Sequence, residues 1–225
     1  MTREVTLTAL SGIKLVGPGD DLGAIAVAAL RENGLIPKDG DVLVVAQKIV
    51  SKVEGRYVDI STVRPSERAI ALAAEVDKDP RFVEVVLSES TRVVRHRPGL
   101  LIVEHCLGFV MANAGIDHSN VAPQDGGERV LLLPKDPDGS ATALRQHLME
   151  IFGVGIGVIV SDSFGRPWRK GTVGVALGVA GLPSFVDLRG HPDLFGRELL
   201  VTETGFGDEI AAAALVRCAE NDLFR

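Results

Sequence analysis

With 225 residues, 46% hydrophobic and 24% charged, the chain has the length and composition of a globular protein with one large domain or two lobes. A formal net charge of −6 and an aromatic content of 4% disfavour nucleic acids and anionic membranes as partners, because both bind basic surfaces and bases also stack on aromatic rings. We expect a cytoplasmic protein with free thiols, because the sequence lacks a signal peptide, a membrane-length apolar run of roughly 18 residues, and metal or redox spacing at Cys106 and Cys218.

The first expected elements are a strand and a helix. Val5, Leu7 and Ala9 alternate with polar residues, which predicts a strand, and the glycines and proline of residues 17–19 interrupt it. Asp20 or Asp21 can then cap an amphipathic helix that ends near Gly34.

The apolar run 42–46 predicts a central strand, followed by a basic segment. Lys48, Lys52 and Arg56 recur every four residues, so they share one face if this segment is helical. They are either a solvated surface or, together with a second basic loop, part of a site for anions.

Residues 61–77 and 80–90 have helical patterns, and strands are predicted at 91–95 and 100–104. The five histidines are scattered without the spacing of a zinc site. The following loop, 112–121, combines Gly115 with the oxygen and amide donors Asp117, Ser119 and Asn120. These donors suit a hard cation, although Asn and Asp are also common in turns for conformational reasons alone.

A short strand at 130–133 precedes a helix at 141–152. Ser140 or Asp138 would cap that helix, which makes Asp136 and Asp138 structural rather than catalytic candidates.

The stretch from Ile156 to Gly171 carries the strongest chemical pattern. Its β-branched run 156–160 predicts a buried strand that delivers Ser161, Asp162 and Ser163 into a loop. A carboxylate with hydroxyl groups suits a divalent cation, and clustered cations suit phosphate or carboxylate groups. A metal-assisted phosphate site is therefore one interpretation, and an ordinary turn with a solvated basic face is the other. The cations in question are Arg166, Arg169 and Lys170.

The small residues of 172–181 fit either a strand packed closely against backbone or a small-residue helix. Strands are expected at 184–188 and 197–204, and a final Ala-rich helix from Ile210 to about 219. The alternation of strands and helices predicts an α/β or α+β fold, and the consecutive strands near 91–111 and 184–204 argue against a purely parallel sheet.

Several motifs in one order resemble those of the coenzyme F420-0:L-glutamate ligases. The resemblance extends from about residue 5 to 214, and a consistent spacing of independent motifs makes it specific. The motifs are Ser51-Lys-Val-Glu-Gly-Arg56, Pro65-Ser-Glu-Arg-Ala69, Asn113-Ala-Gly-Ile-Asp117, Ser119-Asn120, Asp136-Pro-Asp-Gly-Ser140, Ser161-Asp-Ser163, Gly165-Arg166, Gly196-Arg-Glu-Leu199 and Asp208-Glu-Ile-Ala-Ala212.

This resemblance implies a GTP-dependent ligase that activates the terminal carboxylate of F420-0 with the γ-phosphate. The amine of L-glutamate would then displace phosphate to form an amide, and a second round would add a γ-linked glutamate. The resemblance also implies an α+β fold with a mixed, largely antiparallel sheet and flanking helices, built as one unit over residues 1–225 that is either compact or two-lobed. It further implies two divalent cations, Mg2+ or Mn2+, with K+ in some members, and an intertwined homodimer.

Residue roles follow from the same resemblance. Asp117 and Asp162 would hold one metal, and Ser163 would help to hold the second. We expect Arg166, Arg169 and Lys170 to act on phosphate or substrate anions, because acyl-phosphate chemistry must gather negative charge. The expected nucleotide contacts are Gly12, Ile13, Gln47, Lys48, Lys52 and Asn120.

Two departures from the family pattern leave an alternative open. Gln47 and Lys48 stand where small hydroxyl residues are more common, and the pattern continues beyond the Ala-rich helix into a Gly-rich loop with a second-metal ligand, whereas this sequence ends at Arg225. It also lacks the fused flavin-binding domain of some relatives. The alternative functions are a relative that binds an F420-type ligand or nucleotide without ligation, and a small-molecule phosphotransferase.

Overall fold

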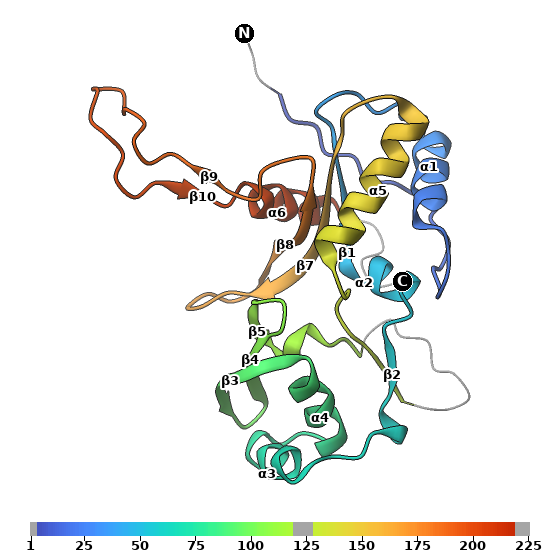
Figure 1. Ribbon diagram of the computed structural model, residues 1–225, viewed down its shortest axis with the longest axis vertical. Helices are drawn as coiled ribbons and strands as arrows, with labels where there is room; N and C mark the ends of the chain where they lie inside the picture. The colour runs from blue at the N-terminus through green and yellow to red at the C-terminus, as the bar shows by residue number, and fades with distance from the viewer. Residues whose placement is uncertain (1–3, 119–127, 219–225) are drawn as a thin grey trace. The chain divides into compact units, whose positions relative to one another are not determined.

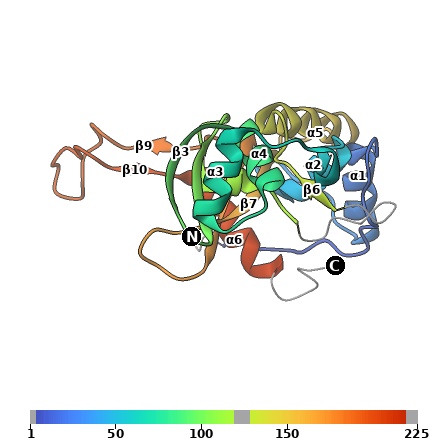
Figure 2. The ribbon, with the colours of Figure 1, turned by 90° about the horizontal axis from the view of Figure 1, so that it is seen from below.

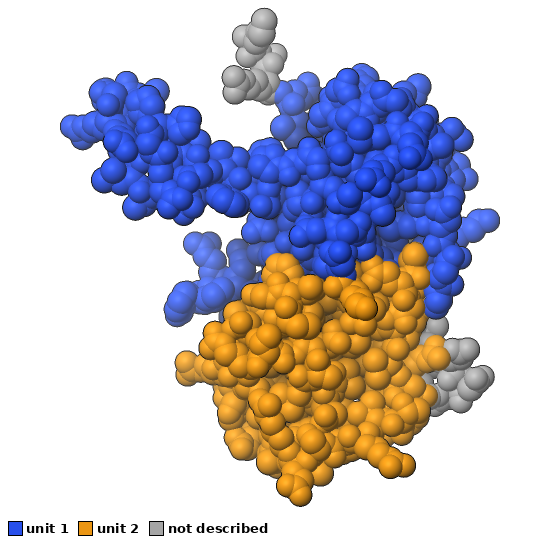
Figure 3. All heavy atoms as spheres, in the orientation of Figure 1, with its two compact units in different colours: residues 1–50, 136–225 blue, residues 51–135 orange. Residues whose placement is uncertain are grey.

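The computed structural model describes residues 4–118 and 128–218. They form two compact units (Figure 3), of which unit 1 comprises residues 1–50 and 136–225 and unit 2 comprises residues 51–135. Unit 2 is thus inserted in sequence between the two parts of unit 1. The described chain is α+β with mixed and antiparallel sheets, as the sequence predicts.

Unit 1 is built on a three-stranded sheet in the order β1-β7-β8 (Figure 1). The first pair is parallel, with Val42 opposite Gly157 and Ala46 opposite Ser161, and β7 and β8 form a long antiparallel hairpin. The prediction of a central strand at 42–46 is wrong in its position, because β1 is an edge strand of this described sheet. The strands are β1 (Val42–Ala46), β7 (Gly157–Gly165) and β8 (Thr172–Ala180).

Two helices pack on opposite faces of this hairpin (Figure 2). A Cβ atom added at Gly174 would lie 2.4 Å from the carbonyl oxygen of Ala211 in α6, and one added at Gly178 would lie 2.2 Å from the backbone of Pro137 in α5. The small residues of 172–181 therefore form a strand in close contact with helix backbone, which resolves the ambiguity of the sequence pattern. These helices are α5 (Pro137–Phe152), which also contacts α1 (Leu22–Glu32), and α6 (Phe206–Cys218).

The helix caps are local and specific. Asp21 accepts a hydrogen bond from the backbone N–H of Ala24 and caps α1, as expected. The cap of α5 is Asp136, which accepts from the N–H of Gly139, so the predicted caps Ser140 and Asp138 are wrong. Asp138 lies inside the first turn, and its carboxylate instead accepts from the N–H of Val179 in β8 at 2.8 Å.

An arm leaves the sheet of unit 1 between β8 and α6 (Figure 1). The predicted strands 184–188 and 197–204 shrink to two paired residues each, β9 (Val186–Asp187) and β10 (Glu203–Thr204). Arg189 contacts both Asp187 and Glu203 across this pair. The large apolar side chains that the arm exposes are Phe185, Leu194, Phe195, Leu200 and Val201.

The strand predicted around Val5, Leu7 and Ala9 is absent, because residues 4–16 have no regular secondary structure. Alternation produces a strand only where a partner strand supplies hydrogen bonds, and among the described residues this segment has none.

Unit 2 has its own core and two small antiparallel sheets. One sheet has the order β3-β4-β5 and the other pairs β2 with β6. Its apolar cluster includes Val83, Leu101 and Val130. The predicted helix 61–77 is divided into η1 (Ile60–Thr62) and α3 (Glu67–Val76), which Ser66 caps. The remaining elements are β2 (Tyr57–Asp59), α4 (Pro80–Ser88), β3 (Ser90–Arg97), β4 (Leu100–His105), β5 (Val110–Ala112), η2 (Asn113–Gly115) and β6 (Arg129–Leu131).

The helix α2 (Gln47–Val53) begins directly after β1. Throughout the described ranges, no helix combines the length and apolar character needed to cross a membrane.

Candidate active site

The carboxyl ends of β1 and β7 bring two predicted groups together in unit 1. Ala46 and Ser161 are the last register partners of this parallel pair, and the next residues are Gln47, which begins α2, and Asp162, which continues β7. Ligands commonly bind where parallel strands end. The sequence predicted both residues, one as a nucleotide contact and one as a metal ligand, and both follow directly after this paired segment.

Asp162 and Ser163 do not lie in a loop, as the sequence predicted, because β7 continues to Gly165 through its pairing with β8. Side chains alternate along a strand, so Asp162 faces the same side as Val158 and Val160, the side that packs against α5. Ser163 faces the opposite side and is exposed, whereas Asp162 is half-buried. A register shift between Val160 and Ser161 marks a bulge at this point, a feature often found beside functional sites.

The three predicted cations lie at the tip of the hairpin, residues 166–171. Asp162 and Arg166 are separated by four residues of extended strand, a distance of about 13 Å. The Nη2 of Arg166 donates to the carbonyl oxygen of Lys170 at 2.9 Å and so closes the tip. The expected single loop of carboxylate, hydroxyls and cations is therefore two groups, one in the strand and one at its end.

The glycine expected at the nucleotide, Gly12, lies beside the end of α1. Asn33 accepts from both the N–H and the hydroxyl of Ser11 and returns a hydrogen bond from its amide to the Ser11 carbonyl at 3.0 Å. Gly12 has φ +80, a conformation that glycine adopts easily, and Ile13 beside it is exposed. Asn33 thus fixes this segment by side-chain hydrogen bonds, which the sequence pattern did not indicate.

Helix α2 carries the other expected nucleotide contacts. Gln47 is 1% exposed, while Lys48 and Lys52 are half-buried and share one face of the helix. Arg56 was grouped with them, but it lies beyond the helix and binds elsewhere.

In unit 2, Asp117 follows a strained turn. Asn113, Ala114 and Gly115 have φ values of 51, 53 and 67, a run of left-handed backbone that is unfavourable for residues with a Cβ. Such strain often marks functional segments. The N–H and carbonyl of Asp117 both pair with Leu131 at 2.9 Å, which fixes its backbone next to β6. Asn120 and Ser119 lie outside the described residues.

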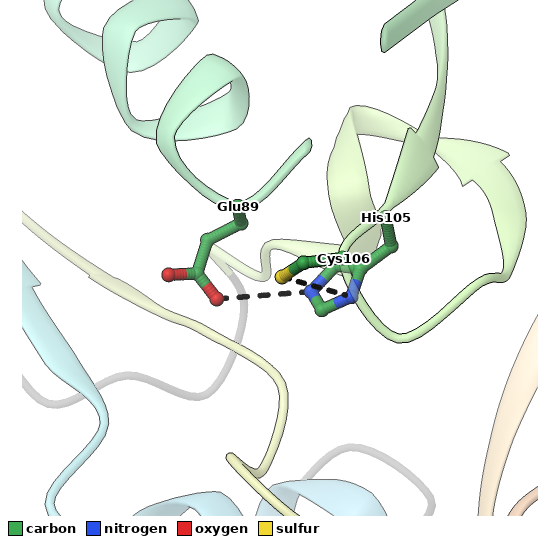
Figure 4. Close-up of side chains that lie close together, drawn as sticks. All are labelled: Glu89, His105 and Cys106. Atoms are coloured by element: carbon green, nitrogen blue, oxygen red, sulfur yellow. Dashed lines mark hydrogen bonds and ion pairs between the residues drawn. The ribbon is translucent and has the colours of Figure 1, made fainter. Parts of the chain in front are cut away.

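A polar cluster around the buried His105, which the sequence did not predict, lies in unit 2 (Figure 4). His105 is 2% exposed, and its Nε2 lies 3.7 Å from Oε2 of Glu89. The same carboxylate oxygen accepts from Arg56 at 2.8 Å. Cys106, an exposed free thiol as expected, lies with its sulfur 3.7 Å from Nδ1 of His105. No sequence signal connects these residues, because a hairpin and a turn bring them together.

The electrostatics of this cluster favour an ion pair between Glu89 and Arg56. The interactions of Glu89 with His105 and with the Arg56 guanidinium lower the pKa of its carboxyl below the ordinary 4.5, against the effect of burial. The contact with His105 is longer than a hydrogen bond, so the direct bond from Arg56 is the stronger of the two.

Glu89, His105 and Cys106 offer three donor atoms within 4.8 Å of one another, a set that could hold zinc. The N–H of Leu107 donates to Nδ1 of His105, however, which leaves the ring proton on Nε2, and Arg56 already occupies the carboxylate. The cluster is therefore better suited to holding Arg56 than to binding a metal.

Comparison with known proteins identifies relatives of the whole described fold. The sequence profile of the family described as F420-0:Gamma-glutamyl ligase matches residues 12–222. A coenzyme F420:L-glutamate ligase of Methanothermobacter thermautotrophicus is 44% identical over 218 residues, which cover 97% of this chain and 85% of the relative. Ligases of the same name from Methanopyrus kandleri and Archaeoglobus fulgidus are 47% and 44% identical, covering 88% and 91% of this chain and 75% and 78% of the relatives.

Proposed function

Because the chain belongs to the F420-0:gamma-glutamyl ligase family, and is therefore an enzyme that joins L-glutamate to coenzyme F420-0, we propose that it does so with GTP through an acyl phosphate. An oxygen of the F420-0 carboxylate would attack the γ-phosphorus of GTP, and GDP would leave. The amine of glutamate would then attack the acyl carbon, lose a proton and expel inorganic phosphate, which leaves an amide. Repetition on the new γ-carboxylate would add a second glutamate.

The observation that carries this proposal is the edge at the ends of β1 and β7. Gln47 and Lys48, at the start of α2, follow the strand paired with the one that carries Asp162. Cations on a helix that begins at this end of β1, together with a carboxylate on β7, suit a nucleotide phosphate with its counter-ion. The proposed nucleotide contacts are Gly12, Ile13, Gln47, Lys48, Lys52 and Asn120.

The donor atoms proposed for the metals fit Mg2+ or Mn2+. Asp117, Asp162 and Ser163 offer carboxylate and hydroxyl oxygens, which hard divalent cations prefer, and neither sulfur nor imidazole is among them. Bound there, two such ions would neutralise phosphate charge, and K+ would be an additional counter-ion. The fixed backbone of Asp117 and the strand position of Asp162 would hold these oxygens in place before substrate binds.

The exposed arm of unit 1 supports the proposal of a homodimer. Leu194, Phe195 and Val201 are largely exposed on a segment with only two pairs of strand residues, and a partner subunit would cover them. Leu194→Ser with Phe195→Ser should then give a monomer by light scattering at unchanged helix content. A wild-type chain that is itself monomeric would contradict the dimer.

Phosphate release and product mass test the reaction. The purified chain with Mn2+, GTP, F420-0 and L-glutamate should release phosphate and form the glutamyl amide, and omission of any component should abolish product. Replacement of GTP by ATP tests the nucleotide. Nucleotide binding without amide product under all conditions would contradict ligation and would favour a protein that only binds these ligands.

A further inference from the structure

The tip of the β7–β8 hairpin presents an unusual aromatic side chain. Trp168 is fully exposed, and it is the only tryptophan in the chain. Its φ of 55 lies in the left-handed region, where a residue with a Cβ is strained. Exposure of an indole and strain of its backbone are both unfavourable in the free protein, so a bound ligand that covers the ring would explain both.

Cations flank Trp168 in the sequence. Arg169 and Lys170 follow Trp168 directly and are exposed, and the described residues include no ion-pair partner for either. Arg166 is held by the carbonyl oxygen of Lys170, which fixes the shape of the tip. An aromatic face next to two cations suits a planar ring that carries anionic groups.

The tip is also continuous with the proposed active site. It continues β7, the strand of Asp162, and the pairing of Gly165 with Thr172 holds its base. A ligand on the tip can therefore extend along β7 toward Asp162, about 13 Å from Arg166.

We infer that Trp168 stacks on the deazaflavin ring of F420-0, while Arg169 and Lys170 bind the phosphodiester that links this ring to the reacting carboxylate. The inference rests on the proposed function and names the element that recognises its acceptor substrate. F420-0 is favoured over GTP because the proposed nucleotide contacts of unit 1 lie on other segments, beside the end of α1 and at the start of α2. Trp168 is then a substrate-binding residue with no part in the bond-making steps.

The single tryptophan allows a direct test on the unmodified protein. Addition of F420-0 to the full chain should quench the intrinsic fluorescence and protect it from iodide, whereas GTP or L-glutamate alone should do neither. Free N-acetyltryptophanamide at the same absorbance corrects for light absorbed by the ligand. Quenching by GTP and not by F420-0 would overturn the inference.

Steady-state kinetics give the second readout. Trp168→Ala should raise KM for F420-0 at least about 10-fold and leave KM for GTP and glutamate unchanged, while Trp168→Phe, which keeps an aromatic face, should have a smaller effect. Arg169→Gln with Lys170→Gln should raise the same KM and reduce its dependence on salt. Unchanged thermal stability and oligomeric state identify these as ligand effects.

The two hypotheses fail in different ways. A wild-type chain that never forms the amide contradicts the proposed reaction, whereas fluorescence quenching by F420-0 would still support the site at Trp168. Ligation by Trp168→Ala with an unchanged KM for F420-0, or dissociation of an oligomer by this variant, would overturn the inference.

Discussion

The two units place their candidate metal-binding carboxylates by different means. Asp162 of unit 1 lies in β7, one residue beyond the last position at which β7 pairs with β1. At this position β7 is still paired with β8. Asp117 of unit 2 follows three left-handed residues, and its backbone is paired with Leu131 in an isolated bridge. A side chain in a paired strand is placed by many backbone hydrogen bonds, whereas one after a strained turn depends on the packing that keeps the turn in place.

The largest expected effect is on the rate of ligation, and it tests whether Asp162 and Asp117 both take part in the same reaction. Asp162→Asn and Asp117→Asn should each lower kcat/KM for ligation roughly 100-fold or more, because a lost carboxylate ligand weakens the neutralisation of phosphate charge. Excess Mn2+ should partly restore either variant. Asp193→Asn and Asp77→Asn are the matched controls in the two units and should retain activity. Full activity of Asp117→Asn would show that the carboxylate of Asp117 is not needed for ligation.

The next prediction concerns the stability of the sheet under Asp162. Gly178→Ala should destabilise unit 1 by about 3 kcal/mol and lower Tm by roughly 6–12 °C, because the added methyl group would lie 2.2 Å from the backbone of Pro137. Gly165→Ala in the same hairpin has open space at its Cβ and should change Tm little. Equal Tm values for the two variants would show that α5 can move away from β8.

A smaller effect is expected at the turn before Asp117. Gly115→Ala should cost about 2–3 kcal/mol, since it combines a left-handed φ with a Cβ 2.6 Å from Met111 and 2.9 Å from Leu133. Gly99→Ala has a similar φ of +77 but open space, so it should cost about 1 kcal/mol. Urea denaturation of both variants measures the packing contribution as their difference, and no difference would mean that the turn is held by its backbone alone.

The smallest predicted effect depends on pH and lies in the polar cluster of unit 2. Because the pKa of Glu89 is lowered in the folded state, its ionised form stabilises the protein above the ordinary value of 4.5, and this contribution is lost as the pH falls through the lower folded pKa. The Tm difference between wild type and Glu89→Gln should therefore be largest near neutral pH and shrink below pH 4.5. Glu104→Gln, at the more exposed pair with Arg92, should change Tm little at any pH. A difference that grows on acidification would contradict this assignment.

The sequence predicted the parts of the fold that local chemistry determines. Asp21 caps α1 because its side-chain oxygen can bind a free backbone N–H group, and the hairpin of β3 and β4 lies where the sequence predicts two strands. The strand predicted from the alternation at residues 5–9 is absent for the opposite reason, because a strand needs a partner that no local pattern supplies. The predicted position of the α5 cap was wrong by a few residues, because several acidic and hydroxyl groups there can each act as a cap.

The residues of the candidate site remain a prediction from the sequence, and the structure shows how those that it describes are arranged. Asp162 and the cations at the hairpin tip were identified from their residue types, but their separation depends on pairing between β7 and β8. The contact of Arg56 with Glu89 was not predictable, because it joins the end of one helix to the end of another. Residue chemistry thus indicated the class of site, while non-local pairing determined its geometry.

The insertion of unit 2 within unit 1 also has a consequence for how the chain folds. Val42 and Gly157 are strand partners, yet the whole of unit 2 is synthesised between them. Residues 51–135 form a contiguous segment with its own apolar cluster, so they can collapse on the ribosome before the partner of β1 exists. Closing a long disordered loop costs more entropy than closing one shortened by a folded segment, so early collapse of unit 2 should lower the barrier to pairing β1 with β7. The edge that carries Gln47 and Asp162 would then form late in synthesis, and nascent chains that stop before β7 would have no such edge.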